Sequence, residues 1–170
     1  QREIVAKARA AGLRLIGPNC MGLINVPGKT ALTVNAVLNQ VKLQVGPLSV
    51  ISQSGSMLGT LITRGQARGL RFSKLVSVGN ECDLGVGEIA NLLVDDPETG
   101  AILLFLETFR DAAQLAHAAR RAFAAGKPVI AYKLGRSEVG RRAAASHTGA
   151  MVGSDDTAKA FFRAHGILRV

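Results

Sequence analysis

Short apolar runs alternate with longer stretches of helical periodicity through most of the chain, beginning near residue 47. The clearest run is 101–106, where every residue is apolar, which predicts a strand buried on both faces. Between such runs, apolar residues recur along one helix face, and glycines or an Asp-Asp-Pro turn end the stretches. The pattern predicts strands over 48–51, 75–78, 101–106 and 129–132, helices over 56–68, 86–94, 111–125 and 155–165, and one more strand that starts at 167.

Strands that alternate with helices of about 10–15 residues are typical of βαβ units. We therefore predict an α/β fold built on a doubly wound parallel sheet, with helices on both faces because the strands are almost wholly apolar. In such a sheet, ligands bind at the carboxyl ends of the strands. The segments in which to seek a site are 52–56, 79–83, 107–110 and 133–147.

The first 46 residues do not follow this alternation. Residues 2–11 have the pattern of a helix that ends at Gly12, and 13–16 that of a short strand stopped by a Gly-Pro turn. Residues 20–46 resemble a linker with one or two edge strands. Because the chain begins with Gln1 inside a predicted helix, we expect it to be a piece of a longer polypeptide.

Composition narrows the classes of partner. The net charge is +9, but the positive residues are dispersed and the chain has one Tyr and no Trp, so we do not expect a nucleic-acid interface. A phosphate-rich small ligand suits the surplus charge equally well. No apolar run approaches the length of a membrane span, so we expect no membrane partner. The two cysteines, Cys20 and Cys82, show no metal or disulfide spacing, which favours a reducing, cytoplasmic location.

The segment Ser52-Gln53-Ser54-Gly55-Ser56 links a predicted buried strand to a predicted helix. Small residues let the backbone approach a ligand closely, and the free N–H groups and dipole of a helix start favour an anion. The segment has neither the lysine of a P-loop nor the G-x-S-x-G of a hydrolase elbow. Taken alone, it is equally well interpreted as a plain serine cap.

His147 lies in Ser-His-Thr-Gly-Ala, where small neighbours leave both ring nitrogens approachable. Imidazole near neutral pH is a competent nucleophile and proton carrier. Glu107 directly follows the most apolar predicted strand, where a carboxylate can orient an imidazole and favour its cationic or phosphorylated form. The alternative for Glu107 is a surface glutamate that starts a loop. Together the two residues suggest a phosphoryl relay.

Two further segments have competing interpretations. Residues 85–90 match G-x-G-x-x-A, but 80–83 separate them from the preceding strand, so a dinucleotide site is not favoured. Residues 17–20 are either a turn that stops a strand or a loop that touches a ligand.

Several motifs occur together in a fixed order, and as a set they resemble the nucleoside-diphosphate-forming acyl-CoA synthetases, relatives of the succinyl-CoA synthetase α subunit. The resemblance covers nearly the whole chain and implies a flavodoxin-like domain. The motifs are Gly17-Pro18-Asn19-Cys20-Met21-Gly22, Ser52-Gln53-Ser54-Gly55, Gly79-Asn80 with Asp83, Glu107, Lys133 with Gly135-Arg136-Ser137, and Ser146-His147-Thr148-Gly149-Ala150.

The resemblance also implies roles for individual residues. His147 would carry a phosphohistidine, and Glu107 would hydrogen-bond its imidazole. The phosphate would bind at the helix start formed by Ser52, Gln53, Ser54, Gly55 and Ser56. Coenzyme A and substrate would lie against Asn19, Cys20, Gly79 and Asn80.

The implied reaction converts acyl-CoA and phosphate to an acyl phosphate, passes the phosphoryl group to His147 and then to ADP, and reverses with ATP. Coenzyme A and ATP or ADP with Mg²⁺ would take part, the nucleotide and Mg²⁺ held mainly by an ATP-grasp domain or subunit outside this chain. The resemblance divides the chain into 1–46 (the end of a coenzyme-A-binding domain and a linker), 47–154 (the phosphohistidine domain) and 155–170 (the start of a following domain).

We therefore expect an acid–CoA ligase that is oligomeric in full length and a fragment that does not turn over alone. Two other functions stay open on the sequence. One is a non-catalytic module that senses acyl-CoA, for example fused to an acetyltransferase. The other is a hydrolase that uses Ser54 with His147.

Overall fold

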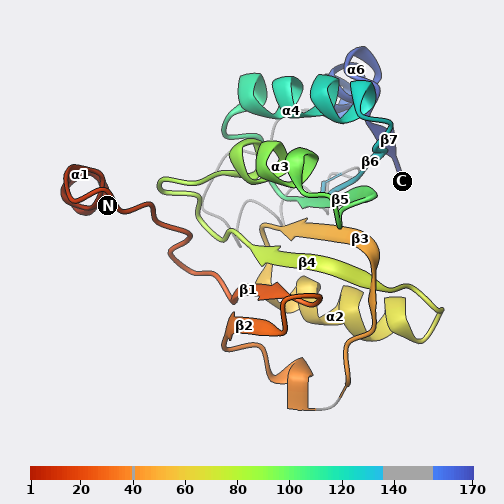
Figure 1. Cartoon of the computed structure of the whole chain (residues 1–170). Helices are drawn as coiled ribbons and strands as arrows, with labels where there is room; N and C mark the ends of the chain where they lie inside the picture. Colours follow the sequence, from red (N-terminus) through yellow and green to blue (C-terminus); the bar gives the residue numbers. More distant parts are fainter. Residues whose placement is uncertain (40, 136–154) are drawn as a thin grey trace.

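The computed structural model describes residues 1–39, 41–135 and 155–170, and it shows a sheet with helices packed on both faces (Figure 1). The strands are β1 (Gly22–Asn25), β2 (Thr30–Thr33), β3 (Val45–Ser52), β4 (Phe72–Ser77), β5 (Ala101–Leu106), β6 (Val129–Lys133) and β7 (Leu168–Arg169). The helices are α1 (Arg2–Ala10), the 3-10 helix η1 (Ala36–Asn39), α2 (Gly55–Gln66), α3 (Val86–Asp95), α4 (Ala112–Ala124) and α6 (Asp155–Ala164).

The strand order is β2-β1-β4-β3-β5-β6-β7. Strands β3 to β7 pair in parallel, as the alternation of strands and helices predicted. The sheet as a whole is mixed, because β1 is antiparallel to both β2 and β4. Only residues 26–29 connect β1 to β2, and a parallel pair needs a crossover of a dozen or more residues, so this pair has to be antiparallel.

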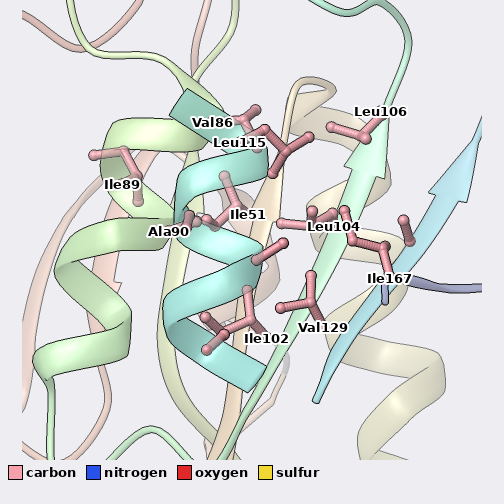
Figure 2. Packing of buried hydrophobic residues seen from close by; sticks show 14 of the residues in the cluster. Ile51, Val86, Ile89, Ala90, Ile102, Leu104, Leu106, Leu115, Val129 and Ile167 are labelled. Atoms are coloured by element: carbon pink, nitrogen blue, oxygen red, sulfur yellow. The ribbon is translucent and has the colours of Figure 1, made fainter. Parts of the chain in front are cut away.

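Two apolar cores lie on the two faces of the sheet. Because side chains alternate along a strand, neighbouring residues of β3 enter different cores: Val50 packs with α2 and η1, and Ile51 packs with α3, α4 and α6. Figure 2 shows the second core, where Ile102 and Leu104 of β5 lie against residues of α3 and α4. The predicted doubly wound arrangement, with helices on both faces, is confirmed.

The segment 13–16, predicted as a strand, is not one. Its backbone instead contacts the loop after β4, where the Leu84 N–H donates to the Leu15 carbonyl at 3.0 Å. A strand needs a partner strand, and the backbone of Leu15 is bonded to Asp83 and Leu84 of this loop instead.

Residues 155–170 do not separate from this body as the expected start of a following domain. Helix α6 places Phe162 in the same core as α3 and α4, and β7 pairs in parallel with β6. Residues 22–33, assigned to the preceding part of the protein, likewise supply β1 and β2 to this sheet.

The shared core predicts that a change in α6 weakens the whole sheet. The Phe162 side chain is 1% exposed, so Phe162→Ala should lower the free energy of unfolding by about 3–5 kcal/mol. Phe123→Ala is the matched control, because Phe123 is 79% exposed on α4. Urea unfolding of the 170-residue chain measures both. A separate transition for α6, or equal midpoints for the two variants, would contradict the shared core.

Candidate functional site

The carboxyl ends of β3 and β5 form a switch point of the sheet. These strands are neighbours, yet the helices that follow them, α2 and α4, lie on opposite faces (Figure 1). A crevice opens where successive connections diverge in this way, and ligands of α/β proteins bind there. The first residues beyond the two strands are Gln53 and Glu107, and the Gln53 N–H donates to the Phe105 carbonyl at 3.1 Å.

Serine side chains shape the turn from β3 into α2. Ser52 Oγ donates to the Ser54 carbonyl at 2.6 Å and accepts from the Ser54 N–H at 3.2 Å. Ser54 caps α2 by accepting from the Met57 N–H at 3.4 Å, and its hydroxyl lies 3.2 Å from that of Ser56. The serine cap interpretation is therefore right for Ser54. It leaves the anion-binding capacity of the helix start intact, because the first N–H groups of a helix have no intrahelical acceptor.

A pocket of about 190 Å³ lies between this turn and the loop before β1. Gly55 allows the close approach, because a Cβ there would fall 2.0 Å from Met21 Cγ. The structure thus brings four of the five residues predicted for phosphate and two of those predicted for coenzyme A to one place; Ser52 is fully buried and does not line the pocket. The lining residues are Asn19, Cys20, Met21, Gln53, Ser54, Gly55 and Ser56.

The loop after β4 holds the loop before β1 in position. The Asn80 N–H donates to the Pro18 carbonyl at 2.9 Å, and the Cys82 N–H to the Gly17 carbonyl at 2.8 Å. Gly79 lies beneath this contact at a φ of +56°, where a Cβ would fall 2.3 Å from the Pro18 oxygen. Gly79 and Asn80 therefore shape the pocket indirectly, by fixing its Asn19 wall.

Asp83 anchors the preceding segment. Its carboxylate accepts from the Leu15 N–H at 2.8 Å and pairs with Arg14 at 2.9 Å and with Arg9 at 2.5 Å. The Arg14 hydrogen bond, followed by that of Leu15, holds the pKa of Asp83 well below its ordinary value. A lowered carboxyl pKa means that the carboxylate stabilises the fold above its ordinary pKa and that this contribution disappears as the pH falls through the lowered pKa.

Glu107 is 5% exposed, so the alternative of a surface glutamate is wrong. The neighbouring Lys133 is 3% exposed and ends β6, where Leu106 is its partner in the parallel pair. Lys133 Nζ donates to the Leu134 carbonyl at 2.6 Å. Burial lowers the pKa of Lys133, while the carboxylates of Asp155 and Glu107 oppose that shift. Buried charges of both signs therefore meet at this edge of the sheet.

Gln53 differs from Ser54 and Ser56, the other pocket residues with polar side chains that were predicted to bind phosphate. Its side-chain oxygen accepts from the backbone N–H groups of Glu107 and Thr108, and its side-chain nitrogen donates to Glu81 and to the Thr108 carbonyl. The backbone N–H of Gln53 is also hydrogen-bonded, so these polar groups of Gln53 all have partners within the protein. Sequence reasoning missed Glu81 and a role for Lys133. The available signal was that both lie at or just beyond the carboxyl end of a predicted strand.

His147 lies outside the described residues, and the segment after β6 is described only as far as Gly135. We call the turn from β3 into α2, residues 52–56, the serine turn. The position of His147 opposite this turn stays a prediction. Within the described ranges, no group of three or more His, Cys, Asp or Glu residues is arranged to hold a metal ion. No helix in the described part of the chain is long and apolar enough to cross a membrane.

Comparison with known proteins gives a consistent result. The model of the family described as "Succinyl-CoA ligase like flavodoxin domain" matches residues 45–170. The ADP-forming acetate–CoA ligase I of Archaeoglobus fulgidus is 35% identical over 99% of this chain, which covers 24% of that protein. The α subunit of the ADP-forming acetate–CoA ligase I of Pyrococcus furiosus is 37% identical over 99% of this chain, which covers 36% of the subunit.

Solved structures agree with the fold. A dinucleotide-forming acetyl-coenzyme A synthetase 1 from Ca. Korarchaeum cryptofilum, in complex with phosphate and ADP, superposes with a TM-score of 0.89 at 34% identity. The match covers 99% of this chain and 36% of that one. The flavodoxin-like α/β fold is confirmed, and the chain spans between about a quarter and about a third of the relatives it matches.

The close packing at Gly79 predicts that adding one methyl group there strongly lowers stability. Gly79→Ala adds the strain of a positive φ, about 1–2 kcal/mol, and a clash with the Pro18 and Asn19 carbonyls that no side-chain rotation relieves. Gly69→Ala is the matched control, because Gly69 has a φ of +82° with nothing within 4 Å of an added Cβ.

We expect Gly79→Ala to lower the urea midpoint more than Gly69→Ala and to speed hydrogen exchange at the Asn80 amide. Equal midpoints, with the Asn80 amide still protected, would show that the two loops do not depend on this contact.

Proposed function

This chain belongs to the family of succinyl-CoA-ligase-like flavodoxin domains, and we propose that it is the phosphoryl-relay domain of an ADP-forming acid–CoA ligase. The observation that carries the proposal is the pocket between the Ser54-capped start of α2 and the loop of Asn19 and Cys20. The buried Glu107 lies at the end of the strand adjacent to β3. Two relatives that match 99% of this chain are ADP-forming acetate–CoA ligases or their α subunit.

In the first proposed step, a phosphate oxygen attacks the thioester carbonyl of acyl-CoA. The C–S bond breaks, the thiolate of coenzyme A leaves, and an acyl phosphate forms. An imidazole nitrogen of His147 then attacks phosphorus, and the P–O bond to the acyl group breaks to release the carboxylate. An oxygen of the ADP β-phosphate finally attacks phosphorus, and the P–N bond breaks to return the neutral imidazole.

The residues of this chain position these groups. We assign the phosphoryl oxygens to the Ser54 and Ser56 hydroxyls and the backbone N–H groups at the start of α2, where the helix dipole favours an anion. We assign the thiol end of coenzyme A to Asn19 and Cys20, across the same pocket. Glu107 would orient the imidazole and favour its cationic and phosphorylated forms. Phosphoryl transfer depends mainly on such positioning and charge stabilisation.

The described lining of the pocket contains no Lys or Arg. The groups that this lining offers a phosphoryl group are hydroxyls, backbone N–H groups and the dipole of a helix start.

The nucleotide site of the proposed enzyme is assigned to another domain or subunit. We assign ATP or ADP and Mg²⁺ mainly to an ATP-grasp domain or subunit, as the family resemblance implies; this chain covers 24% and 36% of the two matched ligase chains. The matched Pyrococcus furiosus protein is itself a subunit, which supports an oligomeric assembly. We expect the enzyme to work in the cytoplasm and the chain alone not to turn over.

Phosphorylation of His147 tests the proposal directly. The full-length protein, incubated with radiolabelled ATP and Mg²⁺, should acquire a phosphate that is labile to acid and stable to base. His147→Asn should abolish the label, whereas His117→Asn, which changes an exposed residue of α4, should keep it. Equal labelling of wild type and His147→Asn would exclude the relay.

The assignment of phosphate to the start of α2 makes a second prediction. Ser54→Ala removes a helix cap, worth about 1 kcal/mol, and a hydrogen bond to an anion, worth about 1.5–3 kcal/mol. The phosphate concentration for half-maximal labelling, measured in the full-length protein with acetyl-CoA and radiolabelled phosphate, should rise about tenfold or more. Thr60→Ala, on an exposed position of α2, should leave it unchanged. An unchanged value for Ser54→Ala would place the phosphate elsewhere.

A further inference from the structure

We propose that Gln53 is a positioning residue of the relay, whose hydrogen bond to Glu81 couples the loop after β4 to the strand end that carries Glu107. The inference rests on the proposed function, since it names how the residues of that site are held. It assigns Gln53 a task other than contact with the phosphate.

The position of Gln53 in the sheet makes the coupling possible. Strand β3 lies between β4 and β5, so the residue that follows β3 is flanked by the loops that follow both neighbours. Gln53 is that residue, and it is 7% exposed. A side chain buried there can reach both loops, and a carboxamide can both donate and accept.

The carboxamide makes four hydrogen bonds to the protein. Its oxygen accepts from the N–H groups of Glu107 at 2.5 Å and Thr108 at 2.9 Å. Its nitrogen donates to Glu81 Oε1 at 2.5 Å and to the Thr108 carbonyl at 3.0 Å. A carboxamide has two N–H groups and two acceptor sites, so its capacity is filled. The opposite orientation of the amide would set oxygen against oxygen and N–H against N–H, so the network fixes which way it points.

On one side, these bonds fix the backbone from which the Glu107 side chain departs. Two consecutive N–H groups and one carbonyl of residues 107 and 108 are bonded to Gln53. Both residues are buried, and the backbone beyond β5 therefore cannot shift without breaking hydrogen bonds away from water.

On the other side, Gln53 is bonded to a half-buried carboxylate. Glu81 Oε1 accepts from Gln53, and Glu81 Oε2 accepts from the Val86 N–H at 2.8 Å, at the start of α3. Burial is the largest influence on Glu81 and raises its pKa. The hydrogen bonds of Val86 and Gln53 and the charge of Arg110 oppose this rise, and the charge of Asp111 adds to it. The neutral donor of Gln53 thus helps to keep this carboxylate ionised.

Glu81 belongs to the same loop as Gly79 and Asn80, which fix the wall of the pocket at Pro18 and Asn19. Gln53 therefore joins the coenzyme A side of the proposed site to the Glu107 side. It does this from within the serine turn, so the three loops that define the site move as one unit.

The test, in the full-length protein, replaces the side-chain N–H donor of Gln53 by an acceptor of nearly the same size. Gln53→Glu keeps an oxygen for the two N–H groups but sets its second oxygen against both Glu81 and the Thr108 carbonyl. Two neighbouring carboxylates hold a shared proton at a higher pH than either would alone. As the pH falls, this proton binds between them and replaces the lost donor. The maximal rate of His147 labelling should drop about tenfold or more at neutral pH and recover in mild acid.

The swap Gln53→Glu with Glu81→Gln restores a donor and an acceptor between the two positions. We expect it to regain part of the neutral-pH rate, because the Thr108 carbonyl still lacks its donor, and to lose the new pH dependence between the two side chains. The phosphate concentration for half-maximal labelling should rise in both variants, because position 53 lines the pocket and its carboxylate repels the anion, so the rescue is measured on the maximal rate. A purely structural role would give neither the acid recovery nor the rescue by the swap.

The matched control is Gln66→Glu. Gln66 also bridges two backbone groups, since it accepts from the Gln44 N–H and donates to the Lys42 carbonyl, but it lies at the far end of α2. Its variant should label at the wild-type rate and with the wild-type pH profile.

The outcomes separate the two proposals. Absence of label on wild-type His147 would overturn the proposed function. Normal wild-type labelling, with a wild-type rate and pH profile for Gln53→Glu, would overturn the role of Gln53 alone. If Gln53→Glu does not fold, Glu81→Gln carries the test, because it sets amide against amide. We then expect a lower rate with no new pH dependence, and a wild-type rate would refute the coupling.

Discussion

The order β4-β3-β5 is the constraint on which the candidate site depends. Because β3 is the middle strand of these three, the turn after it lies between the loops that follow its neighbours. The helices after β3 and β5 lie on opposite faces, so the chain diverges at this point and leaves a crevice. The serine turn, Glu81 and Glu107 are far apart in the sequence and are brought together by this order alone. The Gln53 network then holds them in register.

The described lining of the candidate site offers an anion neutral polar groups. The sequence carries +9, and a phosphate ligand was one possible partner for that charge. In the pocket between the start of α2 and the loop of Asn19 and Cys20, an anion would meet hydroxyls, backbone N–H groups and a helix dipole. Beyond the neighbouring strand ends, Glu107 and Lys133 are buried and Glu81 is half-buried. A charged group is costly to bury unless it is hydrogen-bonded. This explains why Gln53 donates to Glu81 and why Lys133 donates to the Leu134 carbonyl.

In the region before β3, the local sequence pattern predicts extended chain, and pairing in the tertiary structure decides which segments become strands. Residues 13–16 have the apolar pattern of a strand, and they do contact the loop after β4. They are not a strand, because the Leu15 N–H and carbonyl are bonded to Asp83 and Leu84 of that loop and not to another strand. Residues 22–33, which looked like a linker with edge strands, supply β1 and β2 and make the sheet mixed. The pattern indicated extended chain in both places, and pairing with a neighbouring strand decided which became a strand.

The sequence by itself determined the α/β class, the helices on both faces and the segments that carry the motifs. These are consequences of apolar periodicity and of small residues after strands, which are local properties. Only the tertiary structure decided that Gln53 turns toward Glu81 and Glu107, that Glu107 and Lys133 are buried, and that α6 and β7 join the same body. The hydrogen bonds from Gln53 span 28 and 54 residues of sequence. Contacts of that range follow from strand order, which is a property of the whole sheet and of no single segment.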